Sequence, residues 1–449
     1  MEYLTTHMTP SPQPNNGAAS AGDAYLPTSG NGGYLVLHYD LELVYRVETN
    51  QLRGTATITA VATEHLDRFS LDFAGLSVEK LTVDGERPRK VSQAARKIIV
   101  APATPIVPGE QFEIVVRYGG SPHPVKSPWG EVGWEELADG VIVASQPSGA
   151  ASWFPCNDHP SNKATYRIAV TCEAPYTVVA NGVLLEKSTR SGRTTWVYNM
   201  AQPMATYLAT LQIGRYTRRP TTSASLYFPP EIAGNVAVDF GRVDDMIALF
   251  VELFGPYPFD NYSVIVTPDV LEIPLEAQGI GIFGRNHVDG AHGSDRLIAH
   301  ELAHQWFGNS LTVGRWRDIW LHEGFACYAE WLWAEHIGAR TAQESAILYR
   351  GRVKAIPKDG LIVGDPGANA MFDDRVYKRG ALALHAVRSL VGDEAFFDAL
   401  RAWTAQFRHA TVSAERFVTF FEDHTGNDDI GMLIERWIYS ASLPEVVRL

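Results

Sequence analysis

The sequence predicts an α+β multidomain protein, with an N-terminal all-β, sandwich-like domain followed by a mostly helical domain. Two observations support this order. From Tyr34 onward, apolar and polar residues alternate with a period of two, which is typical of strands that bury one face. From Asp295 onward, apolar residues recur instead at helical spacing. A chain of 449 residues has room for both domains and their separate cores.

The first 33 residues are predicted to be a disordered tail. They contain several prolines, the turn-forming runs Asn15-Asn16-Gly17 and Gly30-Asn31-Gly32-Gly33, and no Lys or Arg. They therefore lack the basic and apolar regions of a signal peptide. No stretch of the chain approaches the ~20 apolar residues needed to span a bilayer. The odd number of cysteines, at Cys156, Cys172 and Cys327, gives no disulfide framework, so we expect a cytoplasmic protein without a membrane segment.

An all-β domain is expected over residues 34–214. The alternation is clearest between residues 37 and 47. Similar short runs recur at 69–73, 98–100, 112–118, 166–172 and 195–200. Asn181-Gly182 separates two apolar runs and predicts a two-residue β-hairpin.

A second domain is expected over residues 215–449. It begins with a helical pattern at 236–254, which ends at Gly255-Pro256, and a strand-like run at 262–267 follows. Helices then dominate, with predicted bounds of 296–307, 320–337, 341–355, 377–391, 393–407, 413–424 and 429–440.

The formal net charge is −13, which argues against nucleic acid as a partner because phosphate binding needs a basic surface. An acidic protein is compatible with a cationic substrate such as a free peptide amine. Solubility alone is the simpler explanation of the charge.

The segment His300-Glu301-Leu302-Ala303-His304 carries the strongest chemical signal. In a helix the two histidines lie at i and i+4 on one face, so both can reach one metal ion at about 2.0–2.1 Å. Glu301 lies beside that face, where a general base for a metal-bound water belongs. Glu323 follows 18 residues after His304, in the next predicted helix. Two histidines and one carboxylate leave a fourth position open, which predicts one catalytic zinc ion per chain.

Chance is the alternative explanation, because a bare HExxH arises in about one per cent of chains of this length. The flanking residues Leu297–Phe307 argue against it, since charged groups inside so apolar a helix are costly unless a metal compensates them. Glu330 and Asp318 are candidates to hold a ligand histidine by a hydrogen bond, and each could equally be a solvated surface residue.

Longer segments around this motif resemble the aminopeptidase N-like family of zinc metallopeptidases, the gluzincins. The resemblance rests on residues 300–309, 318–326, 153–160 with Lys163, 203–208 and 254–259, and it covers roughly residues 34–449. It implies a thermolysin-like zinc catalytic domain behind the β domain. The chain stops where the catalytic domain of that family ends, which implies a compact two-domain form without the family's C-terminal helical domain.

The resemblance also implies roles for single residues. His300, His304 and Glu323 would bind zinc and Glu301 would be the general base. Tyr377, in Val376-Tyr377-Lys378-Arg379-Gly380, matches the family tyrosine whose hydroxyl stabilises the oxyanion. Glu276 aligns with the carboxylate that binds the substrate amine, although the residues around it do not match. Gln146, nine residues before Pro155, would be the second amine contact. His322 stands where the family has Asn.

Taken together, the resemblance implies a zinc-dependent aminopeptidase that removes N-terminal residues from peptides with a free N-terminus, using water activated by zinc and Glu301. Two alternatives remain. One is a gluzincin with relaxed amine recognition, acting as an endopeptidase or on another small substrate. The other is a catalytically inactive peptide-binding or scaffold relative. The presence of all three ligands, Glu301 and Tyr377 argues against the inactive alternative.

Overall fold

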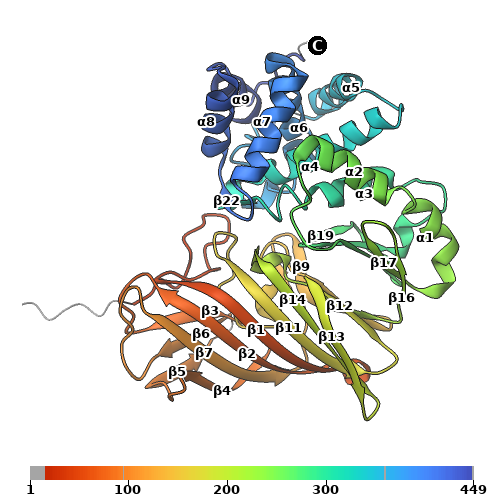
Figure 1. Ribbon diagram of the computed structural model, residues 1–449. Coiled ribbons are helices and arrows are strands. Elements are labelled where there is room, and N and C mark those ends of the chain that lie inside the picture. The colour runs from red at the N-terminus through yellow and green to blue at the C-terminus, as the bar shows by residue number, and fades with distance from the viewer. Residues whose placement is uncertain (1–15, 95, 358–359, 447–449) are drawn as a thin grey trace, which may run out of the picture.

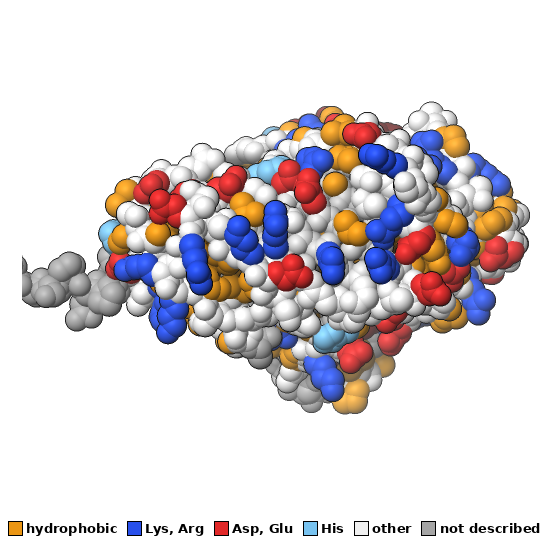
Figure 2. Space-filling view, turned by 90° about the horizontal axis from the view of Figure 1, so that it is seen from below, with side chains coloured by type: hydrophobic (Ala, Val, Ile, Leu, Met, Phe, Trp, Pro, Cys, Tyr) orange, Lys and Arg blue, Asp and Glu red, His pale blue; other side chains and the backbone are white. Residues whose placement is uncertain are grey.

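A computed structural model describes residues 16–94, 96–357 and 360–446. A strand-rich half lies below a helical half (Figure 1). Seen from below, on the side away from the helices, basic and acidic side chains are interspersed over the β domain (Figure 2). Within the described residues, no helix combines the length and the apolar character needed to cross a membrane.

The largest sheet of the β domain has seven strands. In spatial order they are β13 (Val183–Arg190), β14 (Arg193–Ala205), β11 (Lys163–Glu173), β1 (Tyr34–Arg46), β2 (Gln51–Ala62), β7 (Gln111–Gly120) and β4 (Ser77–Val83). Strand β1 buries Leu41, Leu43 and Tyr45 while Glu42 and Arg46 are exposed. The predicted alternation is therefore confirmed from Tyr39 to Arg46, where every second side chain enters the core, but not at Leu37, which is exposed beside a register shift between Val36 and His38.

Two smaller sheets complete the β domain. One contains β12 (Thr177–Ala180), β15 (Leu211–Gly214), β10 (Gly140–Ala144), β9 (Gly130–Leu137) and β8 (Val125–Ser127), and the other contains β3 (Phe69–Asp72), β6 (Lys97–Ala101) and β5 (Lys90–Gln93). Buried aromatic rings join the sheets: Tyr45 of β1 meets Trp134 of β9 edge to face, with ring centroids 4.9 Å apart. The β domain is thus built of sheets packed face to face, as predicted for a sandwich.

The predicted hairpin at Asn181-Gly182 is wrong. Strand β12 pairs with β15, whereas β13 pairs with β14, so the chain crosses from one sheet to another at this point. The side chain of Asn181 is fully buried and donates hydrogen bonds to the carbonyls of Leu208 and Gln278. Gly182 has φ = 89° and lies where a Cβ atom would be 2.1 Å from a backbone oxygen. Asn181 thus contacts both domains, and Gly182 packs closely against Asn199 of the β domain, so these residues serve tertiary contacts rather than a tight turn.

The second domain begins with another five-stranded sheet, in the order β16 (Thr217–Pro220), β17 (Ser225–Phe228), β18 (Ser263–Thr267), β20 (Ile280–Gly284) and β19 (Leu275–Ala277). A short pair, β21 (Thr312–Val313) and β22 (Thr411–Val412), lies further along the chain. The helices are α1 (Ala233–Asp239), α2 (Val243–Phe254), α3 (Asp295–Ala303), α4 (Trp320–His336), α5 (Ala342–Ala355), α6 (Asp374–Val391), α7 (Asp393–Gln406), α8 (Ala414–Thr425) and α9 (Ile430–Ile438).

Two predicted helices differ most from the structure, and the bounds of the others shift by up to three residues. The pattern at 236–254 is split, since α1 ends at Asp239 and α2 begins at Val243; the carboxylate of Asp239 accepts hydrogen bonds from the backbone of Gly290 and His292. Helix α3 ends at Ala303 rather than at 307, because the chain turns sharply through Gly308, whose φ is 125°.

The N-terminal residues 16–33 are not a disordered tail, so that prediction is wrong for this segment, and residues 1–15 lie outside the described residues. Asn31 bonds to Asp72 and Asn157 of the β domain. Asp23 accepts the backbone N–H of Trp316, just before α4, and the hydroxyl of Tyr25 accepts the backbone N–H of Gly367. We call residues 16–33 the N-terminal strap, because they tie the two domains together. The prediction failed because the glycines of this segment are typical of a linker, whereas its polar contacts are made with residues distant in the chain.

Removing the Asp23 carboxylate should destabilise the protein. Asp23 is 7% exposed, and its oxygens lie 2.8 Å from Tyr25 N and 2.9 Å from Trp316 N. Asp23→Ala leaves these buried donors unpaired, so we expect the free energy of unfolding to fall by about 1–3 kcal/mol in urea titrations followed by tryptophan fluorescence. Asp428→Ala, at an exposed position, is the control. Equal stability of the two variants would contradict the role of the strap.

Candidate active site

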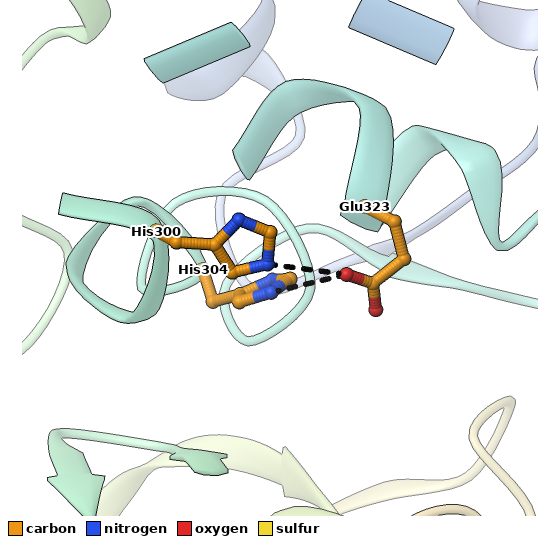
Figure 3. A group of neighbouring side chains, drawn as sticks. All are labelled: His300, His304 and Glu323. Carbon is orange, nitrogen blue, oxygen red and sulfur yellow. Dashed lines mark ion pairs between the residues drawn. The ribbon is translucent and has the colours of Figure 1, made fainter. Parts of the chain in front are cut away.

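The two histidines of the HExxH segment come from the last turn of α3. His304 follows the helix directly but keeps helical dihedral angles, and its N–H donates to the His300 carbonyl at 3.2 Å. Glu323 comes from the first turn of α4. Figure 3 shows both rings pointing one nitrogen at the same carboxylate oxygen: each Nε2 atom lies 3.4 Å from Glu323 Oε2. The structure therefore brings the three predicted zinc ligands together.

Tyr377 reaches this cluster because α4 and α6 cross closely. A Cβ atom on Gly324 would lie 2.7 Å from the Cα atom of Gly380, so side chains at this crossing would push the helices apart. The ring of Tyr377 stacks on that of His300, with centroids 6.0 Å apart. Burial, and then the negative charge of Glu323, raises the pKa of Tyr377, so its hydroxyl keeps its proton and can donate a hydrogen bond.

Each ligand histidine is held by its other ring nitrogen. Glu330 Oε1 lies 2.8 Å from His300 Nδ1, as the sequence predicted for Glu330, and Arg296 contacts the other carboxylate oxygen at 3.0 Å. His304 Nδ1 donates to the backbone carbonyl of Phe307 at 3.0 Å. With both Nδ1 atoms engaged, the Nε2 atoms face Glu323 and are available to a metal.

Asp318 and His322 do not contact the ligand histidines through hydrogen bonds. Both carboxylate oxygens of Asp318 lack a hydrogen-bond partner among the described residues, so its predicted contact with a ligand histidine is wrong. His322 Nε2 accepts the backbone N–H of Val313 at 2.8 Å, and burial lowers the pKa of His322 to about 3. This residue is a neutral support for β21, and its bonded nitrogen is not free for a metal.

Two further carboxylates face the cluster. Ligand atoms of Glu276, Glu301 and His304 lie within 4.8 Å of one another. Glu276 projects from β19, and Gln146, from the loop after β10, donates to it at 2.6 Å. Glu301 is 4% exposed, and its Oε2 atom has no hydrogen-bond partner in the part of the chain that the structure describes. Burial raises the pKa of both carboxyl groups.

The charges of this cluster fit a bound divalent cation. Burial alone would lower the pKa of each ligand histidine. At His300 the carboxylates of Glu323 and Glu330 outweigh burial and raise the pKa to about 9. At His304 the carboxylates of Glu276 and Glu323 outweigh burial and raise the pKa to about 10. No Lys or Arg within the described ranges forms an ion pair with Glu276, Glu301 or Glu323. A metal ion would replace the ring protons and compensate the same carboxylates.

Some supporting groups are not predicted from the sequence. The carbonyl of Phe307 belongs to the backbone and leaves no sequence signal. Arg296 does leave one, because it lies four residues before His300 on the same helix and is the only Arg or Lys of α3.

The β domain, the helical domain and the HExxH helix together define the class of metallopeptidases with an N-terminal β domain. The pattern described as "Peptidase family M1 domain" matches residues 240–437, and "Peptidase M1 N-terminal domain" matches residues 36–208. The chain belongs to peptidase family M1, which confirms the resemblance noted in the sequence.

Relatives agree with this assignment. A crystallised M1 zinc metallopeptidase mutant from Deinococcus radiodurans is 32% identical, with a TM-score of 0.87 over 96% of this chain and 100% of that one. "Probable aminopeptidase 1" from Sulfurisphaera tokodaii is 24% identical over 85% of this chain and 50% of its own length, and "Leucyl aminopeptidase" from Saccharolobus solfataricus is 23% identical over 92% and 54%. The chain thus spans about half the length of these curated relatives.

Loss of either kind of ligand should abolish metal binding. We expect one zinc ion per chain in the wild type after dialysis, and almost none in His300→Ala or Glu323→Ala, because each loses one of three ligands. Elemental analysis measures this directly. Glu301→Gln is the matched control and should retain zinc, since Glu301 is beside the ligand set and not part of it. Wild-type zinc content in His300→Ala would contradict the assignment.

Proposed function

We propose that this protein is a zinc-dependent aminopeptidase that removes N-terminal residues from peptides. The observation that carries the proposal is the pair Glu276 and Gln146, joined at 2.6 Å and placed beside the His-His-Glu set. A metal set alone would serve any metallopeptidase. A carboxylate at one end of the site adds recognition of a substrate's free amine.

His300, His304 and Glu323 would hold the zinc ion. When bound, zinc supplies Lewis acidity, which polarises a carbonyl and lowers the pKa of water. Glu301 takes a proton from the attacking water and later returns it to the leaving amine. Its buried position and its unpartnered Oε2 atom suit this role, because the oxygen is not engaged by the protein.

Tyr377 donates its hydroxyl hydrogen to the carbonyl oxygen as negative charge develops there. Its stacking on His300 places it beside the ligand set, and its raised pKa keeps the phenol protonated at neutral pH. The close crossing of α4 and α6 at Gly324 maintains this placement.

Glu276 and Gln146 bind the substrate's ammonium group, so that only the first peptide bond reaches the water. Charge supports this role. With neutral imidazoles, and with Glu330 paired to Arg296, the carboxylates of Glu276, Glu301 and Glu323 remain. One divalent cation and one ammonium group together neutralise three carboxylates, whereas an uncharged, acetylated N-terminus would leave one uncompensated.

Relatives support the substrate class. A structure of the Deinococcus radiodurans metallopeptidase mutant is described as bound to a Tyr-Ser-Ala substrate, and the matching curated relatives are named aminopeptidases. Peptides with a free N-terminus are therefore the proposed substrates. A cytoplasmic location stays a prediction.

Two substitutions separate chemistry from binding. Glu301→Gln should retain zinc and lose most turnover, because it keeps the shape and removes the base. Tyr377→Phe should lower kcat by about 10²–10³, since the oxyanion loses one donor. Steady-state kinetics on an unblocked dipeptide amide measures both. A rise in KM with unchanged kcat in Tyr377→Phe would place the hydroxyl outside the chemistry.

Blocking the substrate amine tests the exopeptidase assignment. We expect N-acetylation to lower kcat/KM at least tenfold, because a charged hydrogen bond of about 1.5–3 kcal/mol is lost. Glu276→Ala should largely erase the difference between free and acetylated peptides. Equal wild-type rates on both, with cleavage at internal bonds, would favour the endopeptidase alternative.

A further inference from the structure

The amide of Gln305 joins the zinc-binding helix to the strand that carries Glu276. Gln305 follows His304 directly and is fully buried. Its Oε1 atom accepts the backbone N–H of Gly279 at 2.8 Å, and its Nε2 atom donates to the carbonyl of Ala277 at 3.2 Å. One side chain therefore pairs a backbone N–H and a backbone carbonyl at the two ends of the turn 277–279.

Strand β19 needs such a partner. It is only three residues long and lies at the end of its sheet, paired on one side with β20 through Glu276 and Gly281. Just after Glu276, Ala277 and Gly279 turn polar backbone groups away from the sheet. The amide of Gln305 meets these groups where a further strand would otherwise lie.

Residues of the β domain also form hydrogen bonds with this turn. The carbonyl of Gln278 accepts a hydrogen bond from Asn181 at 2.9 Å, and the Gln278 amide donates to the carbonyls of Gln202 and Pro203 at 3.3 and 3.4 Å. Asn309, five residues after His304, donates to the Ala277 carbonyl at 3.0 Å. The turn at 277–279 is thus held between the two domains, and Gln305 is its doubly bonded link to the metal-binding segment.

We propose that Gln305 is a positioning residue for the substrate's N-terminus: it fixes the distance between Glu276 and the zinc ligands. Few residues connect Glu276 to the metal site. Gln305 follows the proposed metal ligand His304 in the chain, and it bonds to Ala277, which follows Glu276. A loosened turn would let Glu276 drift from the ammonium while the metal set stays intact. The inference rests on the proposed function, because it assumes that Glu276 binds the amine.

Gln305→Met tests this by keeping the length of the side chain while removing its hydrogen bonds to Gly279 and Ala277, together with a longer one, 3.4 Å, to the carbonyl of Glu301. The holoprotein is assayed with one peptide in free and N-acetylated form. We expect kcat/KM for the free peptide to fall about tenfold, mainly through KM, and the value for the acetylated peptide to change less than about twofold. Zinc content should equal that of the wild type. Gln343→Met, which removes a glutamine bonded to His385, is the matched control and should not change the ratio.

A second variant guards against misfolding. Gln305→Leu removes the same hydrogen bonds without adding a buried charge, so the ratio of free to acetylated kcat/KM should again fall by about tenfold. An unchanged ratio in a folded, zinc-loaded variant overturns the inference. An equal loss on both substrates, or loss of zinc, also overturns it, because Gln305 would then support the metal site alone.

Glu276→Ala, measured beside these variants, separates the two proposals. If it erases the discrimination while Gln305→Met does not, the positioning role fails and amine binding by Glu276 stands. If it leaves the discrimination intact, the proposed amine anchor itself fails, whatever Gln305 does.

Discussion

The carboxylates of Glu276, Glu301 and Glu323 lie close to the imidazoles of His300 and His304, and the rest of the site depends on how their negative charge is compensated. Glu301 and Glu323 are almost fully buried and Glu276 is half-buried. None of them has a Lys or Arg ion-pair partner within the described residues. Buried charges of one sign are costly unless they are paired or coordinate a metal. In the proposed function, a divalent cation and a substrate ammonium group would compensate them together, so metal binding and amine recognition would have one electrostatic origin.

The fold brings these charges together by joining its two domains at the site. Helices α3 and α4 supply the proposed metal ligands, and the β domain supplies Gln146. Several hydrogen bonds cross the interface: Asn181 bonds to the turn after Glu276, Lys163 donates to the carbonyls of Asn309 and Ser310, and the N-terminal strap bonds to the segment before α4. Since the site spans the interface, the relative position of the domains is part of its geometry.

The strongest local patterns predict most of the fold and the metal set. Period-two alternation identifies β1, and the HExxH spacing places His300 and His304 on one helical face, because both signals depend on neighbouring residues only. Glu330 is also accessible to this reasoning, since it lies seven residues after Glu323 on the same helix. The errors share a different cause. Asn181-Gly182 and the N-terminal strap contain turn-forming residues whose partners, Gln278 and Trp316, are distant in the chain. The role of Gln305 is hidden in the same way, because its bonds go to backbone atoms of another element.

The most direct test is a crystal structure of Glu301→Gln, loaded with zinc and an unblocked tripeptide, with data collected above the zinc absorption edge. The account predicts one anomalous peak in contact with His300 Nε2, His304 Nε2 and the Glu323 carboxylate. It also predicts that the peptide's amino nitrogen lies within hydrogen-bonding distance of Glu276 and Gln146. A peak away from these three ligands, or a peptide that runs through the site with its N-terminus far from Glu276, would contradict it.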